Sequence, residues 1–241
     1  MDDPPRASSR DLAAVRHADD VALVAFDVDG TLVEHDKGEV VWQVLNRRYI
    51  GDSSVNAARF RDFLDGRISY AEWVALDVRG WMQGGATRQG IEHAIRQELR
   101  LVPHAARVVH DLARRGFVVA VVSGTLDIVL DVLFPDHPFA HVFTNRISFG
   151  DDGRISGWSA TPYDMGGKAD ALRMLATKLG LPTHRVAFVG DHVNDCAAMS
   201  LVGCPIAYDP KHDDVRAVAS RILPRGRLDL LLDVFPTCPR S

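Results

Sequence analysis

The 241-residue sequence has few cysteines, no excess of positive charge and no long hydrophobic run. Three cysteines (Cys196, Cys204 and Cys238) are too few for a disulfide framework and suit a reducing compartment. A formal net charge of −4 argues against nucleic acid or an anionic membrane as the main partner, because both attract clustered positive charge. The apolar runs cover about six residues, as in 117–122, where a membrane helix needs roughly 20.

The N-terminus also lacks the charged and then apolar segments of a secretory signal, so we expect a cytoplasmic protein. Residues 1–20 contain prolines, serines and charges and are interpreted as a flexible arm, with at most a short helix around 11–17. The composition beyond the arm, 46% hydrophobic and 25% charged for the whole chain, is that of an ordinary globular protein.

Short apolar runs recur along the chain and are unbroken rather than alternating, at 21–26, 117–122, 186–190 and 205–208. Unbroken runs are typical of strands buried on both faces of a parallel sheet. Helical patterns at 104–116 and 168–180 separate them, each ending on a glycine. The sequence therefore predicts an α/β fold with a doubly wound, Rossmann-like parallel sheet. The segment 147–158, with alternating residues around Asp-Asp-Gly, predicts a β-hairpin.

The segment 34–102 interrupts this alternation of strands and helices. It predicts amphipathic helices near 39–50, 54–65, 69–83 and 87–99, with one apolar face through Trp42, Leu45 and Tyr49 and another through Trp73, Leu76 and Gly80. We interpret 34–102 as a helical cap domain inserted into a catalytic core formed by 21–33 and 103–235. The alternative is a second lobe without functional motion.

Carboxylates follow the first predicted strand directly, as Asp27 and Asp29 in the segment Asp-Val-Asp-Gly-Thr. Ligands of parallel sheets bind at the carboxyl ends of the strands. Two neighbouring carboxylates there repel each other and need a cation or a shared proton. The alternative is an ordinary turn rich in Asp and Gly.

Other strand and helix ends bring further polar groups to the same edge of the sheet. They are Ser123 and Gly124 after the second run, Lys168 at a helix start, and Asp191, Asn194 and Asp195 after the run 186–190. A hydroxyl with free backbone amides suits an anion, although Ser123 could equally cap a helix.

This ordered set resembles the four motifs of the haloacid dehalogenase superfamily of phosphotransferases. The segments VAVVSGTLDIVLDVL, TNRISFGDDGRISG and GDHVNDCAAM, together with the helical insertion, resemble its phosphoserine-phosphatase-like branch. The resemblance covers about residues 21–224. It implies a phosphatase in which Asp27 is the nucleophile and Asp29 the general acid and base.

The resemblance also implies roles for the remaining motif residues. Thr31, Ser123, Gly124 and Asn194 would bind the phosphoryl group, and Lys168 would neutralise charge on phosphate and on Asp27. Mg²⁺ would bind the side chains of Asp27 and Asp191 and the backbone carbonyl of Asp29, with Asp195 mainly supporting them. No histidine spacing predicts a zinc site.

The substrate pocket is the weaker part of the resemblance. Asp36, with Glu34 and Glu39 as neighbours, is the candidate to hold an amino group, and Arg79 is the candidate to hold a carboxylate. His192 either meets substrate or forms a surface ion pair. Trp81 and Met82 either line an apolar pocket or belong to the core of the cap, and Cys196 is interpreted as a packing residue.

The expected function is thus Mg²⁺-dependent hydrolysis of a small phosphate ester, with phosphoserine the leading candidate. The alternatives are a sugar, polyol or biosynthetic-intermediate phosphate, a phosphomutase, or a binding module. Asp29 and the Asp191/Asp195 pair disfavour a dehalogenase. A single lysine in the insertion, Lys37, disfavours a Schiff-base hydrolase. The sequence leaves the oligomeric state open.

Overall fold

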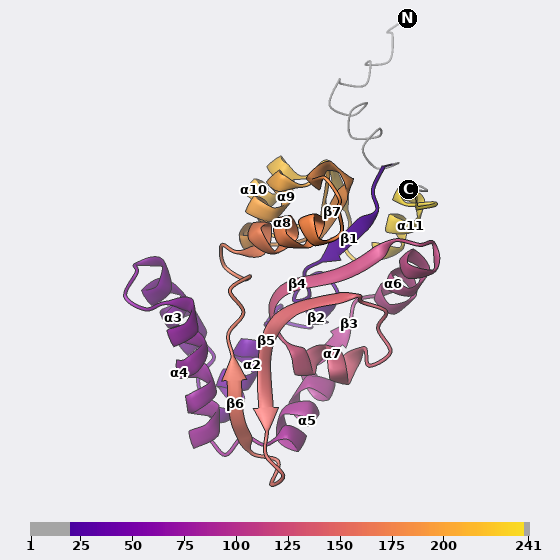
Figure 1. The fold of residues 1–241 in the computed structure, drawn as a ribbon. Coiled ribbons are helices and arrows are strands. Elements are labelled where there is room, and N and C mark those ends of the chain that lie inside the picture. The colour runs from indigo at the N-terminus through magenta and orange to yellow at the C-terminus, as the bar shows by residue number, and fades with distance from the viewer. Residues whose placement is uncertain (1–19, 239–241) are drawn as a thin grey trace, which may run out of the picture.

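A computed structural model describes residues 20–238, so the prediction of a short helix in the N-terminal arm lies outside the described residues. Its centre is a seven-stranded sheet in the order β6-β5-β4-β1-β7-β8-β9 (Figure 1). The strands are β1 (Leu23–Phe26), β4 (Val118–Leu126), β5 (His141–Phe149), β6 (Ile155–Ser159), β7 (Val186–Gly190), β8 (Cys204–Tyr208) and β9 (Arg221–Leu223). All neighbours pair in parallel except β5 and β6, which form the predicted hairpin. The predicted α/β class is confirmed.

Both faces of the sheet are buried, which explains the unbroken apolar runs. In β1, Val24 and Phe26 belong to one hydrophobic cluster, whereas Leu23 and Ala25 belong to a second cluster. The first face packs on α6 (Ala105–Arg114), α7 (Asp127–Leu133) and α11 (Leu231–Val234). The second packs on α8 (Lys168–Lys178), α9 (Cys196–Leu201) and α10 (Asp213–Val218). Short 3₁₀ turns, η1 (Thr183–Arg185), η2 (Val193–Asp195) and η3 (Leu228–Leu230), connect these elements.

The insertion leaves and re-enters the core through a short antiparallel pair, β2 (Val33–His35) and β3 (Leu99–Leu101). Between them lie α2 (Val41–Tyr49), α3 (Ser54–Leu64), α4 (Tyr70–Gln83) and α5 (Arg88–Glu98), so the four predicted helices are confirmed. Side-chain caps start two of them, because Ser69 accepts a hydrogen bond from the Glu72 amide and Thr87 accepts one from the Gly90 amide.

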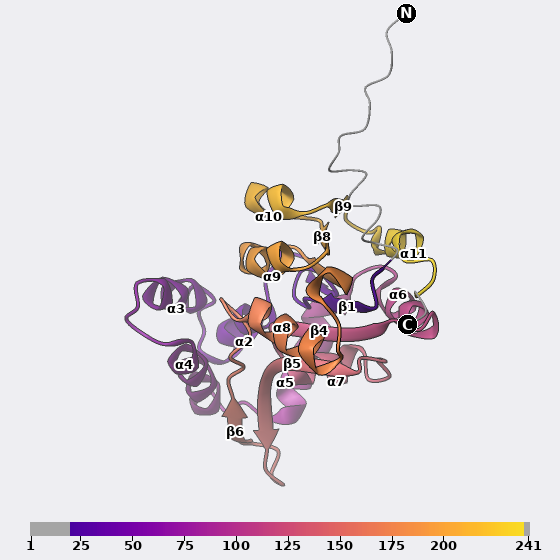
Figure 2. The same cartoon turned by 45° about the horizontal axis from the view of Figure 1, so that its top comes forward.

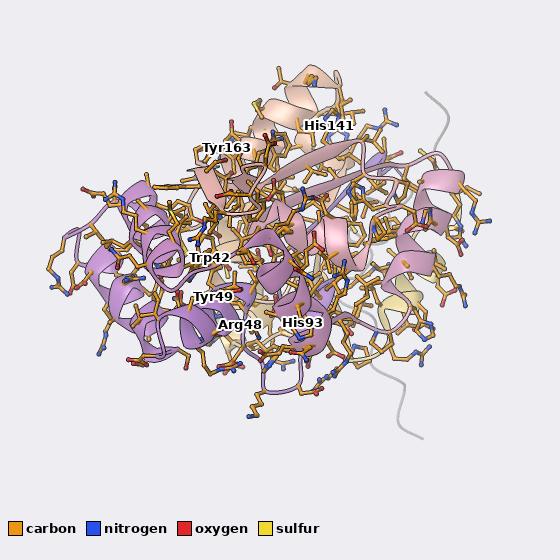
Figure 3. The ribbon with its side chains drawn as sticks, turned by 90° about the horizontal axis from the view of Figure 1, so that it is seen from below. Trp42, Arg48, Tyr49, His93, His141 and Tyr163 are labelled. Atoms are coloured by element: carbon orange, nitrogen blue, oxygen red, sulfur yellow. The ribbon has the colours of Figure 1, made fainter. Side chains whose placement is uncertain are left out.

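The insertion packs unevenly on the core. Trp42 and Leu45 are buried as expected, and Figure 3 shows Trp42 toward the middle of the molecule. The apolar face predicted for α4 is wrong, since Leu76 is 41% exposed and the buried stripe contains Val74, Asp77, Val78 and Trp81. Stacking of Trp81 on Trp42, with ring centroids 5.1 Å apart, sets this rotation of the helix. Trp81 is thus a core residue.

Helix α3 differs from the other three helices of the insertion because it contributes no buried residue. Figure 2 shows α3 and α4 at the margin of the molecule, away from the C-terminal helices. Residues of α2, α4 and α5 join the hydrophobic cluster of the first sheet face, so the insertion and the α/β part of the chain share one hydrophobic cluster. The division of the chain into a catalytic core and a cap domain therefore remains a prediction. In residues 20–238 no helix is long and apolar enough to cross a membrane.

Candidate active site

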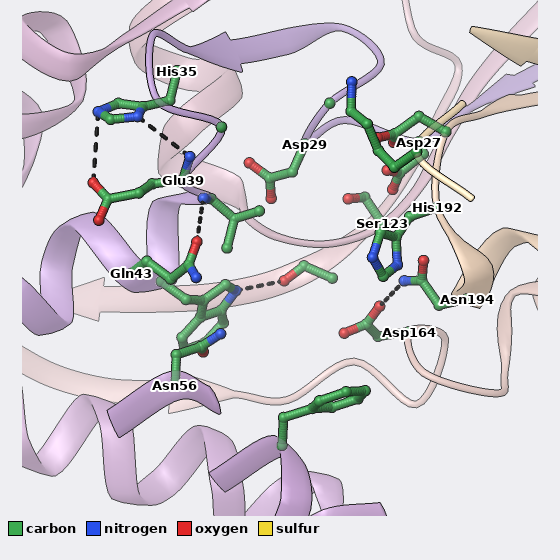
Figure 4. A pocket seen from close by; sticks show the side chains of 18 of the residues that line it. Asp27, Asp29, His35, Glu39, Gln43, Asn56, Ser123, Asp164, His192 and Asn194 are labelled. Carbon is green, nitrogen blue, oxygen red and sulfur yellow. Dashed lines mark hydrogen bonds and ion pairs between the residues drawn. The ribbon is translucent and has the colours of Figure 1, made fainter. Parts of the chain in front are cut away.

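Three parallel strands deliver polar side chains to one edge of the sheet, as expected. Asp27 follows β1, Ser123 lies in the last part of β4, and Asp191 follows β7. All three are at most 5% exposed and line a cavity of about 720 Å³ between the sheet edge and the insertion (Figure 4). The carboxyl ends of the strands thus form the floor of a single pocket.

Lys168, the first residue of α8, joins two of the acids. Its Nζ atom lies 2.7 Å from Oδ1 of Asp27 and 2.7 Å from Oδ1 of Asp195, and all three side chains are buried. Burial raises the pKa of Asp27 to about 7, with further raising by Asp195 and Asp29, while Lys168 opposes the shift. The lysine is therefore the group that favours the ionised, nucleophilic form of Asp27.

Asp195 is held by the loop around it. Its Oδ2 atom accepts hydrogen bonds from the amides of Asp191 (2.9 Å) and His192 (3.1 Å), while its Oδ1 atom accepts from Lys168. A side chain at Gly190 would collide with this carboxylate. Asp195 thus fixes the loop that carries Asp191 and positions Lys168.

The donor set fits a hard divalent cation. One carboxylate oxygen each from Asp27, Asp191 and Asp195 lie within 4.8 Å of one another. Burial, together with Asp27 and Asp195, raises the pKa of Asp191 well above its ordinary value, and the Thr31 hydroxyl, at 3.3 Å, is a neutral donor to it. Mg²⁺ prefers oxygen ligands, and three carboxylates share the single positive charge of Lys168 here. Gly30, at φ 88°, lets the backbone pass against the Asp191 carboxylate.

Asp29 lies between the strand-end residues and the insertion in Figure 4. Burial raises its pKa to about 6, while the Thr125 hydroxyl and the Val41 amide oppose the shift. A carboxyl group with this pKa exchanges a proton close to neutral pH, which suits a general acid and base.

Of the predicted phosphate-binding residues, Ser123, Gly124 and Asn194 line the cavity, and Thr31 does not. The Ser123 hydroxyl accepts a hydrogen bond from the Thr125 amide at 3.1 Å, and the Asn194 amide donates to Asp164 at 3.2 Å. Thr31 directs its hydroxyl to Asp191 instead. The carbonyl of Gly124 accepts hydrogen bonds from Trp42 Nε1 (2.9 Å) and Asn145 Nδ2 (2.7 Å). The first of these bonds ties the segment of Ser123 and Gly124 to the insertion.

Sequence reasoning missed Asp164, Tyr70 and Asn145. Asp164 lines the cavity, and burial raises its pKa, with Lys168 and Tyr70 opposing. Its carboxylate lies so close to Gly124 that a side chain there would collide with it. Asn145 donates a hydrogen bond to the Tyr70 hydroxyl at 2.8 Å. Asp164 lies in an irregular loop before α8, where no periodicity marks a functional residue; its closeness to Lys168 in sequence was the available signal.

The predicted substrate residues are only partly brought together. Asp36 lines the cavity, but its side chain is 76% exposed and forms an ion pair with Arg100. His192 also lines it, with its Nε2 atom 3.2 Å from Nε2 of His212. Arg79 does not line the cavity: it lies exposed on α4, 5.8 Å from the ring centre of Trp158.

The neighbouring acids Glu34 and Glu39 line the cavity and are paired with arginines. Arg225 lies 2.8 Å from Glu34, and Arg47 lies 2.8 Å from Glu39. Arg47 also pairs with Glu98, so the group of His35, Glu39 and Glu98 is an ion-pair cluster around an arginine. Burial raises the pKa of the Cys196 thiol, which is the opposite of what a reactive cysteine requires.

Comparison with known proteins agrees with this geometry. A family model of haloacid dehalogenase-like hydrolases matches residues 24–200. The chain is 32% identical over 211 residues to a phosphoserine phosphatase of Mycobacterium tuberculosis, covering 87% of this chain but only 49% of that protein. It is 30% identical over 212 residues to a phosphoserine phosphatase of Lactococcus lactis, covering 87% and 93%.

Among solved structures, a phospho-aspartyl intermediate analogue of phosphoserine phosphatase superposes with a TM-score of 0.68 at 22% identity. The superposition covers 88% of this chain and 97% of that chain. At this identity the likeness establishes the fold.

Proposed function

The chain belongs to the haloacid dehalogenase-like hydrolases, and from that premise we propose that it is a phosphatase that hydrolyses a small phosphate monoester through a phospho-aspartate on Asp27. The observation that carries the proposal is the buried contact of Lys168 with both Asp27 and Asp195 beside Asp191. That contact would bring a nucleophile, a neutralising cation and a cation site together beside the cavity.

In the first step the Asp27 carboxylate attacks phosphorus and the bond from phosphorus to the ester oxygen breaks. Asp29, with its pKa near 6, gives its proton to the departing alcohol. In the second step Asp29 takes a proton from water, the water oxygen attacks phosphorus, and the bond to Asp27 breaks. The carboxyl group of Asp29 thus acts first as an acid and then as a base.

The other residues of the site hold charge and position. Ser123, the backbone at Gly124 and Asn194 would bind the phosphoryl oxygens, and Lys168 favours the ionised form of Asp27. Asp27, Asp191 and the backbone carbonyl of Asp29 would hold Mg²⁺, with Asp195 supporting the loop. Bound Mg²⁺ would supply positive charge that neutralises the phosphate oxygens and lowers the pKa of the surrounding carboxyl groups.

The names of the relatives make phosphoserine the first ester to test, with the phosphate ester of another small alcohol as the alternative. The experiment measures phosphate release from a panel of esters in Mg²⁺ and in EDTA. It also traps the phosphorylated protein by rapid acid quench and locates the phosphoryl group by peptide mass spectrometry. Metal-dependent phosphate release, with the trapped phosphoryl group on Asp27, supports the proposal. Phosphate release without a phosphoryl group on Asp27, or release that persists in EDTA, contradicts it.

A further inference from the structure

The part of the cavity that faces away from Asp27 is built by the insertion. We call this part the helical wall: Asn56 and Phe60 of α3, and Tyr70, Trp73 and Asp77 of α4. Figure 4 shows Asn56 on the far side of Asp29 from Asp27, where the alcohol part of an ester would lie. Among the described residues, no lysine or arginine of α2 to α5 lines the cavity.

The helical wall contains two acceptor oxygens that lack a hydrogen-bond partner within the described part of the chain. They are Oδ1 of Asn56 and Oδ2 of Asp77, both buried. A buried acceptor without a partner is energetically unfavourable, so this wall is suited to a ligand that donates hydrogen bonds. An ammonium group is such a ligand, because it has three donors and no acceptor.

The negative charge of Asp77 also favours an ammonium group as the ligand. The side chain is fully buried, and its Oδ1 atom accepts from Asn46 at 2.9 Å and from Arg59. Burial raises the pKa of Asp77, while Arg59, Asn46 and the Trp73 indole oppose the shift. These contacts favour the ionised form of the carboxylate, and Asp77 lines the cavity.

Aromatic rings complete the wall. Ring centres of Phe60 and Tyr70 lie 5.9 and 6.0 Å from that of Trp73. Rings around a carboxylate are a recurrent means of binding organic cations, since ring faces attract positive charge. They also exclude water, which strengthens the attraction to Asp77.

A carboxylate on the substrate would meet the opposite conditions. The cavity cations Lys211 and Arg225 come from the core and are paired with Asp209 (2.7 Å) and Glu34 (2.8 Å). Lys37 also lines the cavity, from the exposed loop before α2, outside the helical wall. A second anionic group of the substrate at the helical wall would therefore lie against Asp77 and Asp164, and Arg59 of α3 is already paired with Asp77.

We propose that the substrate is the phosphate ester of an amino alcohol without a carboxylate, whose ammonium group binds Asp77 and Asn56 among the rings of the helical wall. The proposal rests on the phosphatase chemistry proposed above and names the substrate class of that site. It separates this chain from enzymes that require the carboxylate of phosphoserine.

The test uses three phosphate esters built on two carbons whose far ends are positive, neutral and negative: phosphoethanolamine, 2-hydroxyethyl phosphate and phosphoglycolate. Phosphoserine and p-nitrophenyl phosphate complete the set. With the full chain and Mg²⁺, kcat/KM should be highest for phosphoethanolamine and lowest for phosphoglycolate, with about tenfold or more between them. Phosphoserine should fall below phosphoethanolamine, although it carries the same ammonium group.

Variants then locate the effect. In Asp77→Asn the ratio of kcat/KM for phosphoethanolamine to that for phosphoglycolate should fall about tenfold, mainly through KM. Asp65→Asn is the matched control, because Asp65 is exposed, pairs with Arg67 and does not line the cavity. If Asp77→Asn fails to fold, Asn56→Leu on the exposed helix α3 should lower the same ratio by removing one acceptor.

The outcomes separate this inference from the proposed function. If all five esters resist hydrolysis, the phosphatase proposal falls and this inference with it. If they are hydrolysed but phosphoglycolate or phosphoserine exceeds phosphoethanolamine, the phosphatase stands and the substrate class is wrong. An unchanged ratio in both Asp77→Asn and Asn56→Leu would also overturn it.

Discussion

The two sides of the cavity are built differently. On the phosphoryl side, Asp27, Lys168 and Asp195 are held by short hydrogen bonds, and their backbone is fixed by the sheet and by α8. On the helical wall, Asn56 and Asp77 carry buried oxygens without a partner in the described structure. Lys168 neutralises two of the acids at the sheet edge from within the protein, whereas under our proposal the helical wall receives its missing hydrogen bonds from the ligand.

The difference has a physical origin in the elements that carry each side. Parallel strands fix where their carboxyl ends lie, so residues following them converge whatever the rest of the chain does. Helices present different residues according to their rotation, which depends on packing. Changes on the first side should therefore affect every ester alike, and changes on the second should depend on the ester.

The largest effect is expected for Asp27→Asn. Removing the nucleophile should lower kcat for all esters by about 10⁴-fold or more, because no covalent intermediate forms. Thermal unfolding and phosphate binding measured by calorimetry should change little. A variant that kept most of its rate would show that Asp27 is not the nucleophile.

Lys168→Met should combine a loss of rate with a loss of stability. Two buried carboxylates lose their cation, so kcat should fall about 10²-fold, and the free energy of unfolding should fall by about 3–5 kcal/mol. Chemical denaturation in EDTA, paired with steady-state rates in Mg²⁺, measures both. Equal losses of rate and stability in Met174→Leu, an exposed position on the same helix, would remove the special role of Lys168.

The stability loss of Lys168→Met should also depend on pH. The folded pKa of Asp27, about 7, lies above its ordinary 3.8, so the native state binds more protons and stability falls as pH rises from about 4 to 7. Without Lys168 the folded pKa of Asp27 rises further, which extends this loss to higher pH. The deficit relative to wild type in EDTA should be larger at pH 8 than at pH 5. An equal deficit at both values would contradict the assigned pairing.

Asp36→Asn should have a smaller effect that depends on the ester. The carboxylate lies at the cavity rim but is exposed and paired with Arg100, so solvent screens it. We expect kcat/KM for phosphoethanolamine to fall about threefold relative to 2-hydroxyethyl phosphate. A uniform fall for both esters would assign Asp36 to the structure of the loop rather than to amine binding.

Arg79→Ala should have the smallest effect of the series. Its exposed contact with the Trp158 ring is worth about 0.5–1 kcal/mol of stability at most. Steady-state kinetics should show kcat/KM for phosphoserine and phosphoethanolamine within about twofold of wild type. A selective rise in KM for phosphoserine would return Arg79 to the role of carboxylate reader.

The sequence predicts that the strand-end residues of the phosphoryl side lie together, but it predicts neither Asp164 nor the helical wall. Asp27, Ser123 and Asp191 could be placed together because each follows a buried strand. On α4, Arg79 and Asp77 are two residues apart and hence about 200° apart around the helix, so an error in its rotation exchanges one for the other. Contact of Trp81 with Trp42 and with Asn46 (2.7 Å) decides that rotation, and periodicity does not contain this long-range information.

The absence of buried residues in α3 has a consequence for how this molecule can change over time. Asn56 and Phe60 face the cavity from a helix that contributes no buried residue to the core, so substitutions there should leave folding nearly intact. Variants at Asn56 and Phe60, natural or from a randomised library, are expected to accept phosphate esters of other alcohols, while the sheet edge performs the same phosphoryl chemistry. Substitutions in helix α3 are therefore expected to change substrate preference with little effect on folding or on the phosphoryl chemistry.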